Sequence, residues 1–223
     1  MRLGSCFVLF FHHFIISSAV YNRIILVSVP EQDTIMFALI DSEDSNFNLE
    51  RHGTLDLTGV HAPQGLAYDS KSELVYWANG SPERVIRRSS IYGGNSEIII
   101  QNISFDVLAI EVDGPNVYWT QNNELLHFNG ISSIPILQSV GAFRDMRRHG
   151  SNTLYYLTED ENRIGRLRLE NFQAVEDEAF IDVYSYININ GFDVAKKIEG
   201  TVSAITECAL DEILSSVNTT CML

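Results

Sequence analysis

Short segments in which apolar and polar residues alternate, separated by polar turns, follow one another through the middle of the chain. Residues 65–100 contain four of them, which read GLAYD, ELVYWA, RVIRRSSI and SEIII. Alternation is typical of a half-buried strand, and the segments lack the three- and four-residue apolar spacing of a helix. Gly93 and Gly94 stand in the last turn, where they can supply the positive φ angles of a tight hairpin. The pattern predicts four short β-strands joined by turns.

The same order of segments recurs twice further along the chain. An aromatic pair marks the second segment of each copy, and the pairs follow at intervals of roughly 40 residues, which is about the length of one four-stranded propeller blade. We therefore predict an all-β repeat array in which each repeat is one four-stranded sheet. The second copy comprises AIEVD (109–113), VYWT (117–120), ELLHF (124–128) and a strand near 134–137, and the third DMRRH (145–149), TLYYLT (153–158) and RIGRLRL (163–169).

The order GLAYD, VYWAN and RVIRRSSIYGG resembles the YWTD repeat, also called the low-density lipoprotein receptor class B repeat, over roughly residues 21–187. In that family the repeats build a six-bladed β-propeller. The resemblance implies a propeller over residues 20–200, with a half-blade at 21–60 and repeats near 65–105, 107–140 and 143–182. The motif residues are Gly65, Asp69, Tyr76, Trp77, Asp113, Tyr118, Trp119, Tyr155 and Tyr156.

The chain departs from the family pattern in length and in one motif position. Six blades of about 42 residues need about 250 residues, more than the chain has. We therefore expect an incomplete or small YWTD-type propeller of about four to five blades, or a truncated six-bladed ring. The acid that ends the motif is replaced by Asn79, Gln121 and Thr158. Neutral groups must make any contact that the carboxylate makes in the family.

The aromatic pairs have a structural interpretation. Tyr76 and Trp77 are adjacent in a predicted strand, so their side chains point to opposite faces of the sheet. Both faces of a blade are covered by its neighbours, so each side chain is expected to pack between blades. We interpret the pairs as scaffold residues.

Both ends of the sequence indicate an exported protein. Residues 1–19 combine Arg2, an apolar run and small residues before a cleavage position, which predicts a signal peptide and a secreted, extracellular protein. The tail, 201–223, contains a short amphipathic segment that predicts a C-terminal helix. Cys208 and Cys221 are candidates for a disulfide, with two separate thiols as the alternative. Sequons for N-glycosylation stand at Asn102, Asn218 and Asn79.

The composition argues against several functions. The net charge is −14, and removal of residues 1–19 takes away Arg2 and makes the chain more negative still. Such a surface repels nucleic acid and favours cationic partners, although acidity can also serve solubility alone. No apolar stretch has the length of a membrane-spanning helix. Catalytic and phosphate-binding motifs are absent, and the acidic runs lack the spacing of a calcium loop, so we predict no enzyme, no cofactor and no metal.

Function on a repeat scaffold resides in the loops. Our leading hypothesis is a secreted binding module, resembling a lipoprotein-receptor ectodomain fragment, that docks an extracellular protein ligand, with basic proteins as candidates. The alternatives are a metal-dependent propeller hydrolase and an inactive, truncated product of a longer receptor gene. Loops that enter the first strand of a blade and loops that join its second and third strands lie on the same face. The ligand-binding residues predicted there are His61, Gln64, Asn79, Glu83, Asp106, Gln121, Asn122, Phe143, Arg144, Glu159 and Asp160.

Overall fold

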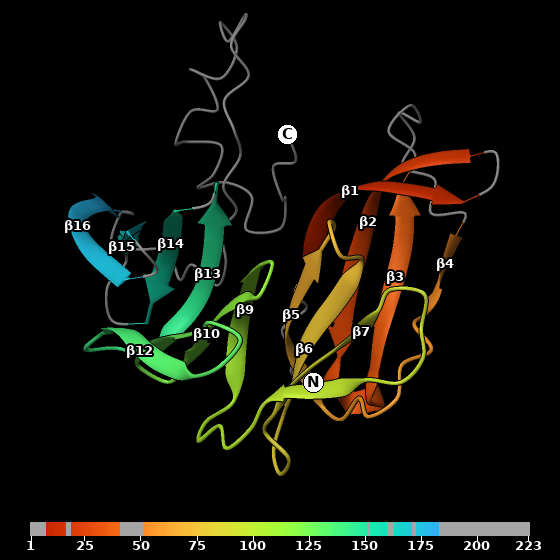
Figure 1. Ribbon diagram of the computed structural model, residues 1–223, viewed down its shortest axis with the longest axis horizontal. Helices are drawn as coiled ribbons and strands as arrows, with labels where there is room; N and C mark the ends of the chain where they lie inside the picture. The colour runs from red at the N-terminus through yellow and green to blue at the C-terminus, as the bar shows by residue number, and fades with distance from the viewer. Residues whose placement is uncertain are drawn as a thin grey trace, which may run out of the picture. The chain divides into compact units, whose positions relative to one another are not determined.

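The computed structural model describes the backbone of residues 8–16, 19–40, 51–150, 152–159, 163–170 and 173–182, with side chains over 24–39, 52–150, 152–159 and 164–170. These residues form four antiparallel sheets of four strands each (Figure 1). All of them belong to one structural unit, residues 1–193. The predicted C-terminal helix, both candidate disulfide cysteines, Asn218 and Asp160 lie outside the described residues.

Each sheet is a meander whose strands pair in chain order. Sheet 1 consists of β1 (Val8–Ile16), β2 (Ala19–Val29), β3 (Thr34–Ile40) and β4 (Arg51–Thr54), with the 3-10 turn η1 (Pro30–Gln32) before β3. Sheet 2 consists of β5 (Pro63–Asp69), β6 (Leu74–Asn79), β7 (Ile86–Ser90) and β8 (Glu97–Ile100). Sheet 3 consists of β9 (Val107–Asp113), β10 (Asn116–Gln121), β11 (Glu124–Phe128) and β12 (Ser133–Gln138). Sheet 4 consists of β13 (Phe143–His149), β14 (Thr153–Thr158), β15 (Arg163–Glu170) and β16 (Gln173–Asp182).

The alternation pattern therefore predicted the strands of sheets 2 and 3 and the first three strands of sheet 4 within a few residues, but it did not predict β16. The all-β prediction is confirmed. A half-blade was expected at residues 21–60. The structure has a four-stranded sheet there, sheet 1, which also includes β1. Strand β1 comes from the predicted signal peptide and pairs with β2 from Val8↔Val27 to Ile16↔Ala19. Cleavage after residue 19 stays a prediction.

Turn residues fix the hairpins of sheet 2. The Asp69 side chain accepts hydrogen bonds from the Lys71 backbone N–H (3.0 Å) and the Ser72 hydroxyl (2.7 Å). This Asp therefore closes the turn between the first and second strands. Gly93 and Gly94 have φ angles of 95° and 113°, as the hairpin after β7 requires.

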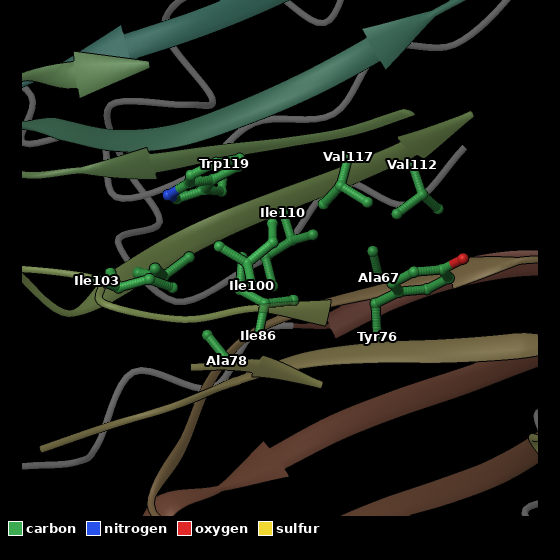
Figure 2. Close-up of a cluster of buried hydrophobic side chains, with 11 residues drawn as sticks. Ala67, Tyr76, Ala78, Ile86, Ile100, Ile103, Ile110, Val112, Val117 and Trp119 are labelled. Atoms are coloured by element: carbon green, nitrogen blue, oxygen red, sulfur yellow. The ribbon is translucent and has the colours of Figure 1, made fainter. Parts of the chain in front are cut away.

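The core lies between neighbouring sheets. Trp77 packs in a buried cluster with residues of sheet 1, among them Ile24 and Leu26. Tyr76, on the opposite face of β6, packs in a cluster with sheet 3, and Figure 2 shows it with Trp119 in that cluster. Each seam, meaning the contact between two neighbouring sheets, is thus filled by an aromatic residue from one sheet or from both.

The arrangement repeats at the next seam. Tyr118 and Tyr156 lie together in the cluster between sheets 3 and 4, while Trp119 faces sheet 2. The first aromatic residue of a pair therefore faces the following sheet, and the second faces the preceding one. Tyr76, Trp77, Tyr118 and Trp119 are each at most 2% exposed.

Gly65 allows the first strands of sheets 2 and 3 to approach each other. A Cβ atom at Gly65 would lie 3.1 Å from Ile110 Cγ1 and 3.2 Å from the carbonyl groups of Val107 and Leu108. Two of these contacts are to backbone atoms, which cannot move aside as a flexible side chain can. The close approach of the two strands therefore explains why a glycine, and no larger residue, stands at this motif position.

Candidate functional site

Two kinds of connection end at the same edge of each sheet: the loop that enters its first strand and the loop that joins its second and third strands. We call the surface they form the loop face. Connections at the other end of the strands, such as 91–96 and 129–132, form the opposite loops. The described residues of the loop face are 30–33, 59–62, 80–85, 101–106, 122–123, 139–142 and 159.

Asn79 organises the loop face next to sheet 2. Its side chain is 1% exposed, and Oδ1 accepts hydrogen bonds from Trp77 Nε1 (3.0 Å) and the His61 backbone N–H (3.1 Å). Its Nδ2 donates to the Gly59 carbonyl (2.9 Å) and to the Glu83 carboxylate. A carboxylate could accept the first two bonds but could not donate the other two. The neutral residue at this motif position therefore joins two segments of the loop face, 59–62 and 80–85, to strand β6.

Glu83 is held from two sides. Its carboxylate pairs with Arg87 Nη2 at 2.7 Å and also accepts the bond from Asn79. The hydrogen bond from Arg87 is the main reason why the pKa of Glu83 lies below its usual value, and the bond from Asn79 adds to this. Glu83 is therefore a fixed negative charge on the loop face at neutral pH.

Each seam carries a link between a second-to-third-strand loop and the loop that enters the next sheet. Asp33 Oδ1 lies 3.2 Å from His61 Nδ1 and accepts the Ala62 N–H at 2.6 Å. Arg84 Nε donates to Asp106 Oδ1 at 2.9 Å. At the third seam the link is backbone to backbone: the amide of residue 143 donates to the carbonyl of residue 122 at 2.7 Å. These links hold the loops of neighbouring sheets together.

Two large apolar side chains of the loop face are exposed. Phe105 is 51% exposed and Val140 is 91% exposed, and each lies in a loop that enters a first strand. Neither was among the residues predicted from the sequence. Acidic residues outnumber basic ones around them. The acids are Glu31, Asp33, Glu83, Asp106 and Glu159, and the bases are Arg84, Arg87 and Arg144.

The predicted ligand-binding residues fall into two groups. Asn79, Gln121 and Phe143 are buried and form the framework under the loops. Gln121 Nε2, for example, donates to Glu124 at 3.1 Å, and the Phe143 ring meets Tyr156 edge-on at 5.5 Å between centroids. The half-buried or exposed group consists of His61, Gln64, Glu83, Asp106, Asn122, Arg144 and Glu159.

Solved structures resemble this arrangement. A chain of a nidogen/laminin complex aligns with a TM-score of 0.55 and 17% identity, over 69% of this chain and 58% of that chain. A chain of a mitotic checkpoint complex aligns with a TM-score of 0.53 and 9% identity, over 77% of this chain and 54% of that chain. The chain has a β-propeller-type fold. It spans just over half the length of these solved chains. No protein-family model matches the sequence, so membership of the YWTD family stays a prediction.

The propeller's seam between sheets 3 and 4 is polar where the preceding seam is apolar. Glu111 stands opposite Tyr118 just as Ala67 stands opposite Tyr76, so the two residues occupy equivalent positions. Glu111 is half-buried, and burial raises its pKa to about 7 against the opposing effect of Arg147 and Arg148. The carboxylate of Asp145 adds to the increase.

Further charged and polar groups surround this seam. Arg147 Nη1 lies 2.6 Å from Asp145 Oδ1, and Arg148 Nη1 lies 3.4 Å from Asp113 Oδ2. The ring of His127 stacks on Tyr118, with centroids 4.7 Å apart, and burial lowers the pKa of His127. The seam between sheets 3 and 4 therefore differs from the preceding seam, because it contains a carboxyl group whose pKa lies near neutral pH.

Two findings on the described residues concern metal sites and membrane-spanning helices. That part of the chain brings together no group of three or more His, Cys, Asp or Glu side chains that could hold a metal ion. None of its helices has the length and hydropathy needed to cross a bilayer.

Proposed function

We propose that the chain is a secreted, non-enzymatic binding module of the YWTD type that docks a basic extracellular protein on the loop face. The observation that carries this proposal is the exposure of Phe105 and Val140 on an acidic surface whose loops are linked to one another. Aromatic and aliphatic side chains that are exposed before binding gain free energy when a partner buries them. Function on such scaffolds depends on the loops more than on the sheets.

The links between the loops bear on affinity. Ordering a flexible loop on binding costs about 0.5–1.5 kcal/mol for each side chain that is immobilised. Loops that are already joined, as through Asp33 and His61 or through Arg84 and Asp106, lose less freedom when a partner docks. The loop face is therefore suited to rigid recognition of a protein surface.

The acidic surplus of the loop face favours a basic partner. Opposite charges steer two proteins together and increase the association rate, and this effect weakens as salt is added. Export is supported by the signal-type sequence of residues 1–19. One structural neighbour was crystallised as a nidogen/laminin complex, so a protein of this fold has been seen with a protein partner.

The test compares two double variants of the full-length chain. In Phe105→Ser/Val140→Ser the apolar side chains of the loop face are removed, and in Tyr92→Ser/Ile131→Ser two exposed side chains of the opposite loops are removed. Tyr92 is 62% exposed and Ile131 90% exposed, so the second pair is a matched control. Binding partners are first captured from conditioned medium by cross-linking to the purified wild-type chain. Each is then purified, and its affinity for the three proteins is measured by biolayer interferometry.

The proposal expects the loop-face variant to bind at least about tenfold more weakly, which is the loss of about 1.4 kcal/mol, while the control stays within about twofold of wild type. Association of the wild type should also slow as salt rises. A partner whose affinity falls equally in both variants would place binding elsewhere and refute the proposal. An absence of any partner that distinguishes the two variants would refute it as well.

A further inference from the structure

The loop that enters sheet 3 presents a sequon in an unusual setting. Residues 101–106 read QNISFD, and the middle residue of the sequon, Ile103, is only 8% exposed. Its side chain lies in the buried cluster between sheets 2 and 3, where Figure 2 shows it near Ile100 and Ile86. Asn102 and Ser104, on either side of Ile103, are exposed. The core thus holds the centre of the sequon while both residues that the modification needs face solvent.

The sequon at Asn79 lies in the opposite environment. Asn79 is 1% exposed, and its amide nitrogen, the atom that a glycan would occupy, donates to the Gly59 carbonyl at 2.9 Å and to Glu83. A sugar on this nitrogen would replace one of its two hydrogens, so at least one of these bonds would be lost, and the sugar would have to fit inside the loop framework. Glycosylation of Asn79 is therefore incompatible with the described fold, whereas Asn102 can carry a glycan without disturbing any buried group.

We propose that Asn102 carries an N-linked glycan and that this glycan flanks the docking surface at Phe105. The proposal rests on the export assumed in the proposed function, because the donor is a lipid-diphosphate-linked oligosaccharide of the secretory pathway. In the transfer, Asn102 Nδ2 forms a bond to C1 of the first sugar. The bond between C1 and the diphosphate oxygen breaks, the lipid diphosphate leaves with the electron pair, and the amide nitrogen loses one proton to a base.

The position of the glycan gives it a consequence for binding. Phe105 is three residues from Asn102 in the same loop, and Asp106 links this loop to Arg84 of the preceding one. A branched, hydrated sugar at Asn102 would stand beside Phe105 and limit the directions from which a partner reaches it. The glycan would therefore select among partners of the loop face.

Occupancy is tested by translating the full-length chain with microsomes. Enzymatic deglycosylation converts the modified Asn to Asp, which peptide mass spectrometry then locates. We expect the conversion at Asn102 in the wild type and its loss in Asn102→Gln and in Ser104→Ala. Ser104→Thr should keep the glycan, because it preserves the sequon. Ser104 is exposed, so neither of its variants is expected to disturb the core.

The outcomes separate this inference from the proposed function. A chain that is protected from added protease, and is therefore translocated, but lacks a glycan at Asn102 would overturn the inference and leave export intact. A chain that is not protected would overturn export, and the inference with it. A glycan at Asn79 in folded, secreted chain would overturn the argument from burial.

The second half of the inference has its own measurement. Hydroxyl-radical oxidation of Phe105 is compared between the glycosylated wild type and Ser104→Ala, with Tyr92 of the opposite loops as the internal control. We expect Phe105 to be oxidised about twofold or more slowly when the glycan is present, and Tyr92 to react equally in both. Equal oxidation of Phe105 would show that the glycan does not flank the docking surface.

Discussion

Replacing Glu111 with Gln should make the propeller more stable at neutral and alkaline pH. Glu111 is half-buried at the seam between sheets 3 and 4, and burial raises its pKa to about 7 from an ordinary value of 4.5. Between these two values the folded chain keeps the proton that the unfolded chain has lost. The free energy of unfolding therefore falls as the pH rises from about 4.5 through about 7, and this contribution levels off about one pH unit above the folded pKa.

The size of the effect follows from the pKa difference. One unit of pKa corresponds to about 1.4 kcal/mol, so ionisation of Glu111 costs the folded state about 3 kcal/mol at alkaline pH. About 2 kcal/mol of this is lost between pH 5.5 and 8. Gln resembles the protonated carboxyl group in shape and charge, and its side-chain oxygen can still accept a hydrogen bond at this position. The Gln variant should therefore lack this part of the pH dependence.

The assay is urea unfolding, followed by the fluorescence of Trp77 and Trp119 at pH 5.5, 6.25, 7 and 8. This range stays above the isoelectric point, which is about 4.7. Glu97→Gln is the control, because the Glu97 carboxylate is 60% exposed and lies in the outer strand β8. The quantity compared is the change in the free energy of unfolding between pH 5.5 and 8, so that other titrating groups cancel between variants.

We expect wild type and Glu97→Gln to lose about 2 kcal/mol more across this range than Glu111→Gln does. Equal pH dependence in all three proteins would refute the reasoning. It would mean that Arg147 and Arg148 stabilise the carboxylate enough to cancel its burial. A Glu111→Gln variant that is less stable than wild type at pH 8 would point to the same conclusion.

Three further substitutions test the scaffold, each measured by urea unfolding. Trp77→Ala should cost about 3–5 kcal/mol, because the side chain is fully buried between sheets 1 and 2, and normal stability would remove it from the core. Gly65→Ala should cost about 1–3 kcal/mol through contact with the backbone of Val107 and Leu108, and a neutral result would show that the strands can separate. Asn79→Ala should cost about 1–3 kcal/mol and speed hydrogen exchange over 59–62, and unchanged exchange there would contradict its role.

The strands could be predicted because they depend on local information. Alternation, turn residues and the aromatic pairs all lie within single segments, and the bounds of β5 to β15 follow them closely. The opposite orientation of Tyr76 and Trp77 follows from strand geometry alone. The residues that pack against Tyr76 from sheet 3 and against Trp77 from sheet 1 could not be predicted in this way. The two sides of a seam lie in segments that are distant in the sequence.

The loop face could be predicted only in outline. Its loops follow from the order of strands, but exposure depends on packing between segments that are distant in sequence. Phe143 and Phe105 both stand near the start of a first strand, yet one is 1% and the other 51% exposed. The role of Asn79 was also hidden, because Gly59, His61 and Glu83 belong to other loops. From the sequence, Asn79 indicated only that the acid which ends the family motif is missing at this position.

The orientation of the aromatic pairs makes every joint in the array directional. Tyr76 faces forward to Trp119, and Trp77 faces backward, so a front surface always meets a back surface. A contact between two different surfaces is called heterologous when it joins the subunits of an oligomer. Such a contact can be extended by adding copies in the same direction. A tandem duplication of residues 63–106 would offer each copy a complementary neighbour on both sides. An inverted unit would set Trp against Trp. The number of repeats can thus change by whole units in evolution or design, while the direction of the chain is fixed by the joints themselves.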